Sequence, residues 1–161
     1  MQADIQDEGL LAQAATLAGA TVAIVKHSGR RGTQQEFAAL VTALEEAIAE
    51  HPDNAYVQVL LTPETREQIA GFAERYVKVP KQTEVSDFKL AALNRCGQAA
   101  EWLAKHAPPK AAAEVKASII AACRSVASES KEGGPFNLVA DNIDTAELNA
   151  IEEVVRALGA D

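Results

Sequence analysis

The sequence has few of the residues that build sheets or disulfide scaffolds. Aromatic residues make up only 4% of its 161 residues, and it contains two cysteines, one methionine and one tryptophan. Strands favour aromatic and β-branched side chains, whereas alanine, which is abundant here, favours helices. A chain of this length can bury about two-thirds of its surface around one core. We therefore expect a single all-α domain, residues 1–161, built as a bundle of about six helices.

Cysteine and histidine are too scattered for the common metal and redox motifs. Cys96 and Cys123 lie far apart without a C-x-x-C spacing, which argues against a disulfide framework or a zinc knuckle. His27, His51 and His106 form no H-x-x-x-H or E-x-x-H pair, so we expect solvated histidines at helix ends. The sequence also lacks a Ser-His-Asp order and a glycine-rich dinucleotide turn. We expect a protein that is not an enzyme.

Positive charge is in the minority. The chain has 15 basic and 23 acidic residues and a net charge of −8, which disfavours binding to nucleic acid or to anionic membranes. The first residues, MQADIQDEG, are acidic where a signal peptide would be basic, so a cytoplasmic location is expected. The uncharged run at residues 10–25 is shorter than the roughly 20 residues that span a bilayer. We expect it to form a buried central helix without membrane insertion.

Hydrophobic periodicity and capping signals divide the chain into helices. We expect helices over residues 8–27, 34–50, 55–61, 63–76, 86–106, 109–131 and 145–158. The expected N-caps are Thr33, Thr62, Ser86 and Asp144, and those at 33 and 144 are followed by a glutamate that completes a capping box. Apolar residues at three- and four-residue steps predict the buried faces of three helices: Phe37, Leu40, Val41, Leu44, Ala47 and Ile48; Val115, Ile119, Ala122, Cys123 and Val126; and Leu148, Ile151, Val154, Val155 and Leu158.

The turn KHSGRRGTQQEF, residues 26–37, gathers basic residues around two glycines. It is not a P-loop, because the spacing is G-x-x-G-T, a helix precedes it, and no lysine stands at the required place. The free N–H groups that begin the following helix would attract an anion or an acidic partner. The candidate contact residues are Lys26, Arg30, Arg31 and Thr33, and the alternative is a solvated turn.

A second turn is acidic. Glu129, Glu132, Asp141, Asp144 and Glu147 lie within nineteen residues, and carboxylate oxygens suit calcium or magnesium. The spacing does not fit an EF-hand loop. We take Glu132, Asp141, Asp144 and Glu147 as candidate ligands of a divalent cation. The alternative is that the last two residues serve only as helix caps.

The two halves of the chain resemble each other weakly. When Thr33 is set against Asp144, Glu36 falls on Glu147, and Phe37, Leu40 and Leu44 fall on Leu148, Ile151 and Val155. Each half then consists of an apolar helix, a glycine turn, a capping box and an amphipathic helix. The alternative to a duplication is that glycine stops and capping boxes are common to many helix pairs.

The second half contains Lys131-Glu132-Gly133, then Ile143-Asp144-Thr145-Ala146-Glu147, and finally Leu158-Gly159. This pattern resembles the tellurite-resistance TerB-like helical domain, whose turns carry Ala-x-x-Asp-Gly and Ile-Asp-x-x-Glu before a helix ending in Leu-Gly. The resemblance covers about residues 22–48 and 122–159. Two residues depart from the family pattern. Ser28, before the first glycine, stands where the family has an acidic residue, and Glu132, before the second, stands where it has aspartate. The resemblance implies an all-helical bundle of bacterial origin, acidic turns that bind a divalent ion, and a link to stress responses.

These observations favour a non-catalytic binding or scaffolding module that works through a protein partner, self-association or an ion at the two glycine turns. The alternative is a divalent-cation sensor that uses the acidic turn at residues 129–147. A further alternative is a small helical enzyme, for which a deep pocket with a strongly perturbed titratable group would be the evidence.

Overall fold

The computed structural model describes residues 5–132 and 145–160. Within these residues the protein has seven helices and no strand, which confirms the all-α prediction. The helices are α1 (Ile5–Ile24), α2 (Gly29–Glu50), α3 (Ala55–Gln58), α4 (Pro63–Arg75), α5 (Gln82–His106), α6 (Pro109–Glu132) and α7 (Thr145–Leu158). Among the described residues, no helix is both long and apolar enough to cross a membrane.

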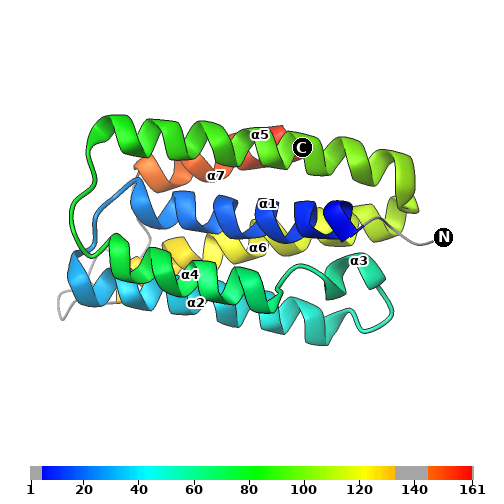
Figure 1. The fold of residues 1–161 in the computed structure, drawn as a ribbon, viewed down its shortest axis with the longest axis horizontal. Coiled ribbons are helices and arrows are strands. Elements are labelled where there is room, and N and C mark those ends of the chain that lie inside the picture. The colour runs from blue at the N-terminus through cyan, green and yellow to red at the C-terminus, as the bar shows by residue number, and fades with distance from the viewer. Residues whose placement is uncertain (1–4, 133–144, 161) are drawn as a thin grey trace.

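Helix α1 is the axis of the bundle, as its uncharged sequence predicted. Figure 1 shows α1 running through the middle, with α5 and α7 along one side of it and α2 and α4 along the other. Small side chains allow the neighbours to approach closely: a Cβ added at Gly19 would lie 2.3 Å from Leu40 Cδ1 of α2. From Leu11 to Ile24 nearly every apolar side chain of α1 is buried. The interior is therefore closely packed around a helix rich in alanine.

The predicted apolar faces are largely confirmed. On α6 all five expected residues are buried, and on α2 the side chains of Phe37, Leu40 and Leu44 are buried. Leu148 of α7 is the exception, because 43% of it is exposed. The buried row of α7 runs through Glu147, Ile151, Val154 and Leu158, at steps of four, three and four residues. Glu147 therefore occupies the inward position that was predicted for Leu148.

Two helix starts differ from the prediction. Helix α1 ends at Ile24, and α2 begins at Gly29 with Ser28 as its N-cap, so the predicted start at residue 34 is wrong. The chain reverses at Gly29, whose φ of +77° favours glycine, and this brings the helix start forward. Helix α5 likewise starts at Gln82 after Lys81 instead of after Ser86. The prediction for Thr62 is confirmed, because it caps α4 in a capping box with Thr65.

Aromatic contacts connect helices at both ends of the bundle. Phe72 of α4 lies between Phe37, Tyr76 and Phe88, with ring centroids 6.4, 6.0 and 5.3 Å away. At the other end, the ring of Tyr56 from α3 lies 5.8 Å from that of Trp102, which also stacks on His106 within α5 at 4.7 Å. Aromatic contacts therefore join α5 to α4 near its start and to α3 near its end.

Candidate functional site

Two glutamates that are far apart in the sequence lie in the core at one end of the bundle. Glu36 of α2 has no exposed surface, and Glu147 of α7 is 1% exposed. Figure 1 shows that α2 and α7 both begin at this end. The negative charge of Glu147 raises the pKa of Glu36, so the two carboxyl groups interact. We call Glu36 and Glu147 the carboxylate pair; they are the residues that the weak internal repeat aligned.

Of the two glutamates, Glu36 is the one whose carboxyl group is buried without a hydrogen bond and has a raised pKa. Neither carboxylate oxygen has a hydrogen-bond partner among the described residues. The pKa of Glu36 is raised to about 8, mainly because the side chain is buried, and the charges of Glu147 and Glu129 contribute to this increase. Ser28 and Lys26 lie close enough to oppose this increase, although the Ser28 hydroxyl does not meet the geometry of a full hydrogen bond. At neutral pH the Glu36 side chain is therefore protonated unless another positive charge joins it.

The glycine at position 32 allows Ser28 to approach the pair. A Cβ added at Gly32 would lie 2.7 Å from the Cβ of Ser28 and 4.0 Å from Oε1 of Glu36. A separation of 2.7 Å between carbon atoms is a steric clash, so any side chain at this position would displace Ser28. The first turns of α2 are thus arranged so that a hydroxyl and a carboxyl group face each other.

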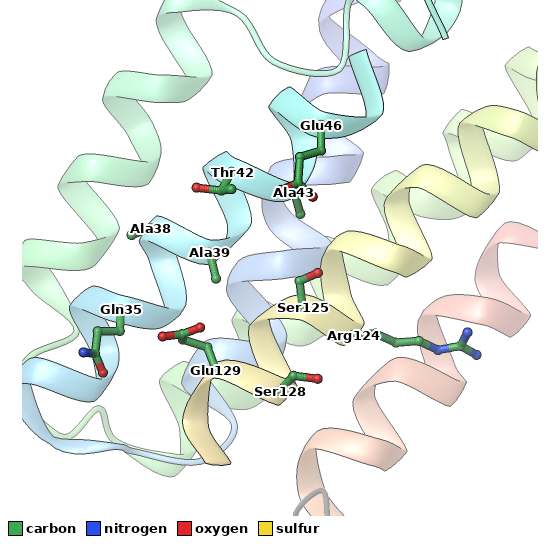
Figure 2. A pocket seen from close by; sticks show the side chains of 10 residues that line it. All are labelled: Gln35, Ala38, Ala39, Thr42, Ala43, Glu46, Arg124, Ser125, Ser128 and Glu129. Carbon is green, nitrogen blue, oxygen red and sulfur yellow. The ribbon is translucent and has the colours of Figure 1, made fainter. Parts of the chain in front are cut away.

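A cleft of about 540 Å³ between α2 and α6 lies beside the carboxylate pair. Its lining consists mainly of small and polar residues: Gln35, Ala38, Ala39, Thr42, Ala43, Glu46, Arg124, Ser125, Ser128 and Glu129. Figure 2 shows Glu129 pointing across the cleft toward Gln35 and Ala39, whereas Arg124 points away from it toward α7. Because the charge of Glu129 also raises the pKa of Glu36, the cleft holds a carboxylate within electrostatic range of Glu36.

The predicted acidic turn is only partly within the described structure. Glu147 is described and belongs to the carboxylate pair. Glu132 is the last residue of α6, but its side chain lies outside the described part, and so do Asp141 and Asp144. Across the side chains that are described, no three His, Cys, Asp or Glu residues come close enough together to hold a metal ion. The described structure thus provides two buried carboxylates, and the turn that joins α6 to α7 lies outside it.

The predicted anion-contact residues lie around the start of α2. Lys26, Arg30 and Arg31 are exposed there, and Ser28 makes no side-chain capping bond. Thr33 is 2% exposed and lies inside α2, so its predicted role as N-cap is wrong. The reason is the early helix start, which leaves Thr33 as the fifth residue of the helix. Anion binding by the three basic side chains stays a prediction.

The expectation of solvated histidines is wrong for His27. Its Nε2–H donates to the carbonyl oxygen of Val77 at 3.0 Å, and its Nδ1 accepts from the N–H of Gly29 at 3.3 Å. These two bonds define a neutral tautomer. The imidazole therefore connects the turn between α1 and α2 to the segment between α4 and α5, beside the carboxylate pair.

At the opposite end, His51 belongs to a hydrogen-bonded network. Its Nδ1 lies 3.2 Å from Glu114 Oε2. Asn54 donates to Glu114 Oε1 at 3.0 Å and to the carbonyl oxygen of Ala111 at 3.2 Å. The amide oxygen of Asn54 accepts from the N–H groups of Tyr56 and Val57 at the start of α3. At this end of the bundle, the buried amide of Asn54 therefore has hydrogen-bond partners for both its oxygen and its nitrogen.

Sequence reasoning assigned Glu36 to a capping box and so missed its buried position. A usable signal was present, because Glu36 precedes Leu40 and Leu44 at four-residue steps in the buried row of α2. Glu147 precedes Ile151 in the same way on α7. A glutamate at a core position of two aligned helices predicts a buried carboxylate pair.

No protein-family model matches the chain, and neither a curated protein nor a solved structure shows a significant match to it. The TerB-like resemblance therefore stays a prediction that depends on the motifs of the second half. The chemistry of the site is argued below from the carboxylate pair alone.

Proposed function

We propose that this protein is a non-catalytic helical binding module that holds a divalent cation, magnesium or calcium, between Glu36 and Glu147. The observation that carries this proposal is the burial of both carboxyl groups together with the two unpartnered oxygens of Glu36. Buried polar atoms without partners are rare in native proteins, and each costs free energy. A cation between the two side chains would supply the partner that the Glu36 oxygens lack.

The chemistry of the pair suits a hard cation. Carboxylate oxygens are the preferred ligands of magnesium and calcium, and magnesium commonly uses one or two protein carboxylates while it keeps several waters. Glu129 adds negative charge from the cleft, and Lys26 opposes it with a positive charge. The local field is therefore negative, as a cation site requires.

The two thiols support a role without covalent catalysis. Burial raises the pKa of Cys96 to about 12 and raises that of Cys123 as well. Because the thiolate is the reactive form of cysteine, these residues are suited to packing and not to nucleophilic attack. Both are fully buried in the core, as the sequence predicted for Cys123.

Thermal unfolding of chelator-treated protein, with and without magnesium or calcium, tests the proposal. A ligand at a hundred times its Kd stabilises the native state by about 2.7 kcal/mol, which raises Tm by a few degrees. Glu36→Gln and Glu147→Gln should each abolish the increase. The control Glu46→Gln, which changes an exposed glutamate of the same helix, should retain it. Asp141→Asn and Asp144→Asn would show whether the acidic turn completes the site.

Two outcomes would reject the cation site. One is an unchanged Tm of the wild type at saturating magnesium and calcium, which would mean that Glu36 and Glu147 are buried without a cation. The other is an increase in Tm that survives in both glutamine variants. Isothermal titration calorimetry on the same proteins gives the stoichiometry, which should be one cation per chain.

A further inference from the structure

Helix α7 covers only part of the surface formed by α5 and α6. It has 14 residues, whereas α5 has 25 and α6 has 24. The ion pair between Lys89 and Glu153, at 3.1 Å, joins the eighth residue of α5 to the ninth of α7. Figure 1 shows the two helices starting at the same end and α7 stopping near the middle of α5. The last twelve residues of α5, about 18 Å of helix, therefore extend beyond α7.

An apolar groove of about 520 Å³ lies beyond the end of α7. Its lining comes from the ends of three helices: Leu103, Ala104, Ala107, Pro109, Ala112, Ala113, Lys116, Ala117, Ile120, Gly159 and Ala160. Leu103 and Ala112 are buried and form part of its floor, whereas Ala104, Ala113 and Ala117 are exposed. This groove, which we call the α5–α6 groove, continues the surface on which α7 lies.

The way α7 binds indicates what the α5–α6 groove would accept. Ile151, Val154 and Leu158 are buried against the bundle, while Glu153 forms its ion pair with α5 at the edge. The open groove has the same features, an apolar floor and a lysine, Lys116, among its lining residues. The charged residue in the lining of the groove is therefore a basic one, in a protein whose net charge is −8.

We propose that the α5–α6 groove docks an amphipathic helix of about three turns from a partner protein, with bulky apolar residues on one face and acidic residues beside Lys116. The length follows from the twelve uncovered residues of α5 at 3.6 residues per turn. Bulky side chains are required because the exposed walls are alanines, which leave space for the guest to fill. The acidic residues follow from the positive charge of Lys116.

The peptide TAELNAIEEVVRAL, which has the sequence of α7, serves as the probe because it is itself an acidic amphipathic helix. Titration of the fluorescently labelled peptide with the intact protein, followed by anisotropy, should show saturable binding. Ala113→Arg and Ala117→Arg fill the groove and should each weaken binding at least tenfold. Lys116→Glu should weaken it most at low salt. The matched control Ala121→Arg, on an exposed alanine of α6 outside the groove, should bind as the wild type does.

Three results would overturn the proposal. The first is the absence of saturation with the wild type. The second is equal binding by the wild type and by Ala113→Arg and Ala117→Arg, which would place the peptide elsewhere, for example on the seat of α7 itself. The third is a dimer in sedimentation velocity that Ala113→Arg dissociates, which would assign the groove to a second copy of this chain. Circular dichroism of each variant confirms that its helices are intact.

Discussion

The two ends of the bundle both carry buried polar side chains, and they differ in how these are paired. Around Asn54 all four hydrogen-bonding positions of the amide are used, by two backbone N–H groups, one backbone carbonyl and Glu114. Around Glu36 neither oxygen has a partner among the described residues. A fully paired network stabilises one arrangement of helices, whereas an unpaired carboxyl group costs stability. The two ends therefore differ in pairing, since the amide of Asn54 is fully hydrogen-bonded and the carboxyl group of Glu36 has no partner among the described residues.

The largest effect is expected at the paired end. Asn54→Ala removes the N-cap of α3 and leaves the partners of the amide without bonds, so unfolding free energy should fall by about 2–4 kcal/mol. Urea denaturation followed by circular dichroism measures the loss. Asn94→Ala, which changes an exposed asparagine of α5, should shift stability by less than about 0.5 kcal/mol. A loss below 1 kcal/mol for Asn54→Ala would show that the network contributes little.

At the Glu36 end, substitution is expected to increase the free energy of unfolding, whereas Asn54→Ala lowers it. The pKa of Glu36 is about 8 in the folded chain, against 4.5 ordinarily, so the unfolded state loses this proton first as pH rises. The contribution of Glu36 is zero below pH 4.5 and becomes increasingly destabilising up to about pH 8. The charges that act on it come from Glu147 of α7, Glu129 of α6 and Lys26 of the turn.

Glu36→Gln should therefore stabilise the chelator-treated protein by about 1–3 kcal/mol at pH 8 and by almost nothing at pH 4. Urea denaturation across this pH range measures the difference between variant and wild type. Glu46→Gln is again the matched control, since Glu46 is exposed on the same helix. A wild type whose stability difference from the variant is independent of pH would contradict the buried, unpaired state of Glu36.

A smaller effect is expected for Glu114→Gln in the paired network. Glu114 is 30% exposed at its side chain, accepts from Asn54 and lies 3.2 Å from His51 Nδ1. The glutamine retains one acceptor oxygen but loses the charge and the second acceptor, so stability should fall by about 1 kcal/mol. The same denaturation measurement applies. A loss as large as that of Asn54→Ala would mean that the network fails as one unit.

The smallest effect is expected for Arg30→Gln combined with Arg31→Gln. Both side chains are exposed at the start of α2, so stability should change by less than about 0.5 kcal/mol. If the predicted anion contact is real, phosphate should raise the Tm of the wild type and not that of the double variant. A phosphate effect that is equal in the two proteins would remove the arginines from any anion site.

Local patterns were sufficient for much of the fold. The uncharged run of α1 predicted its central position, and Val115, Ile119 and Val126 predicted the inner face of α6, because three- and four-residue spacing determines which side of a helix is apolar. Thr62 before Pro63 predicted the start of α4 for the same local reason. The boundaries at Thr33 and Ser86 were wrong, since several nearby residues can cap a helix and packing selects among them.

The sequence by itself determined an all-α chain, the buried row of each main helix and the acidic balance of the surface, because these depend on composition and on spacing within one helix. Only the tertiary structure decided where Glu36 and Glu147 lie. Once α2 starts at Gly29, Glu36 is its eighth residue and is buried in the core, where its pKa is affected by the charge of Glu147, a residue 111 positions later in the chain. The α5–α6 groove also required the structure, since it arises from the unequal lengths of helices that lie side by side.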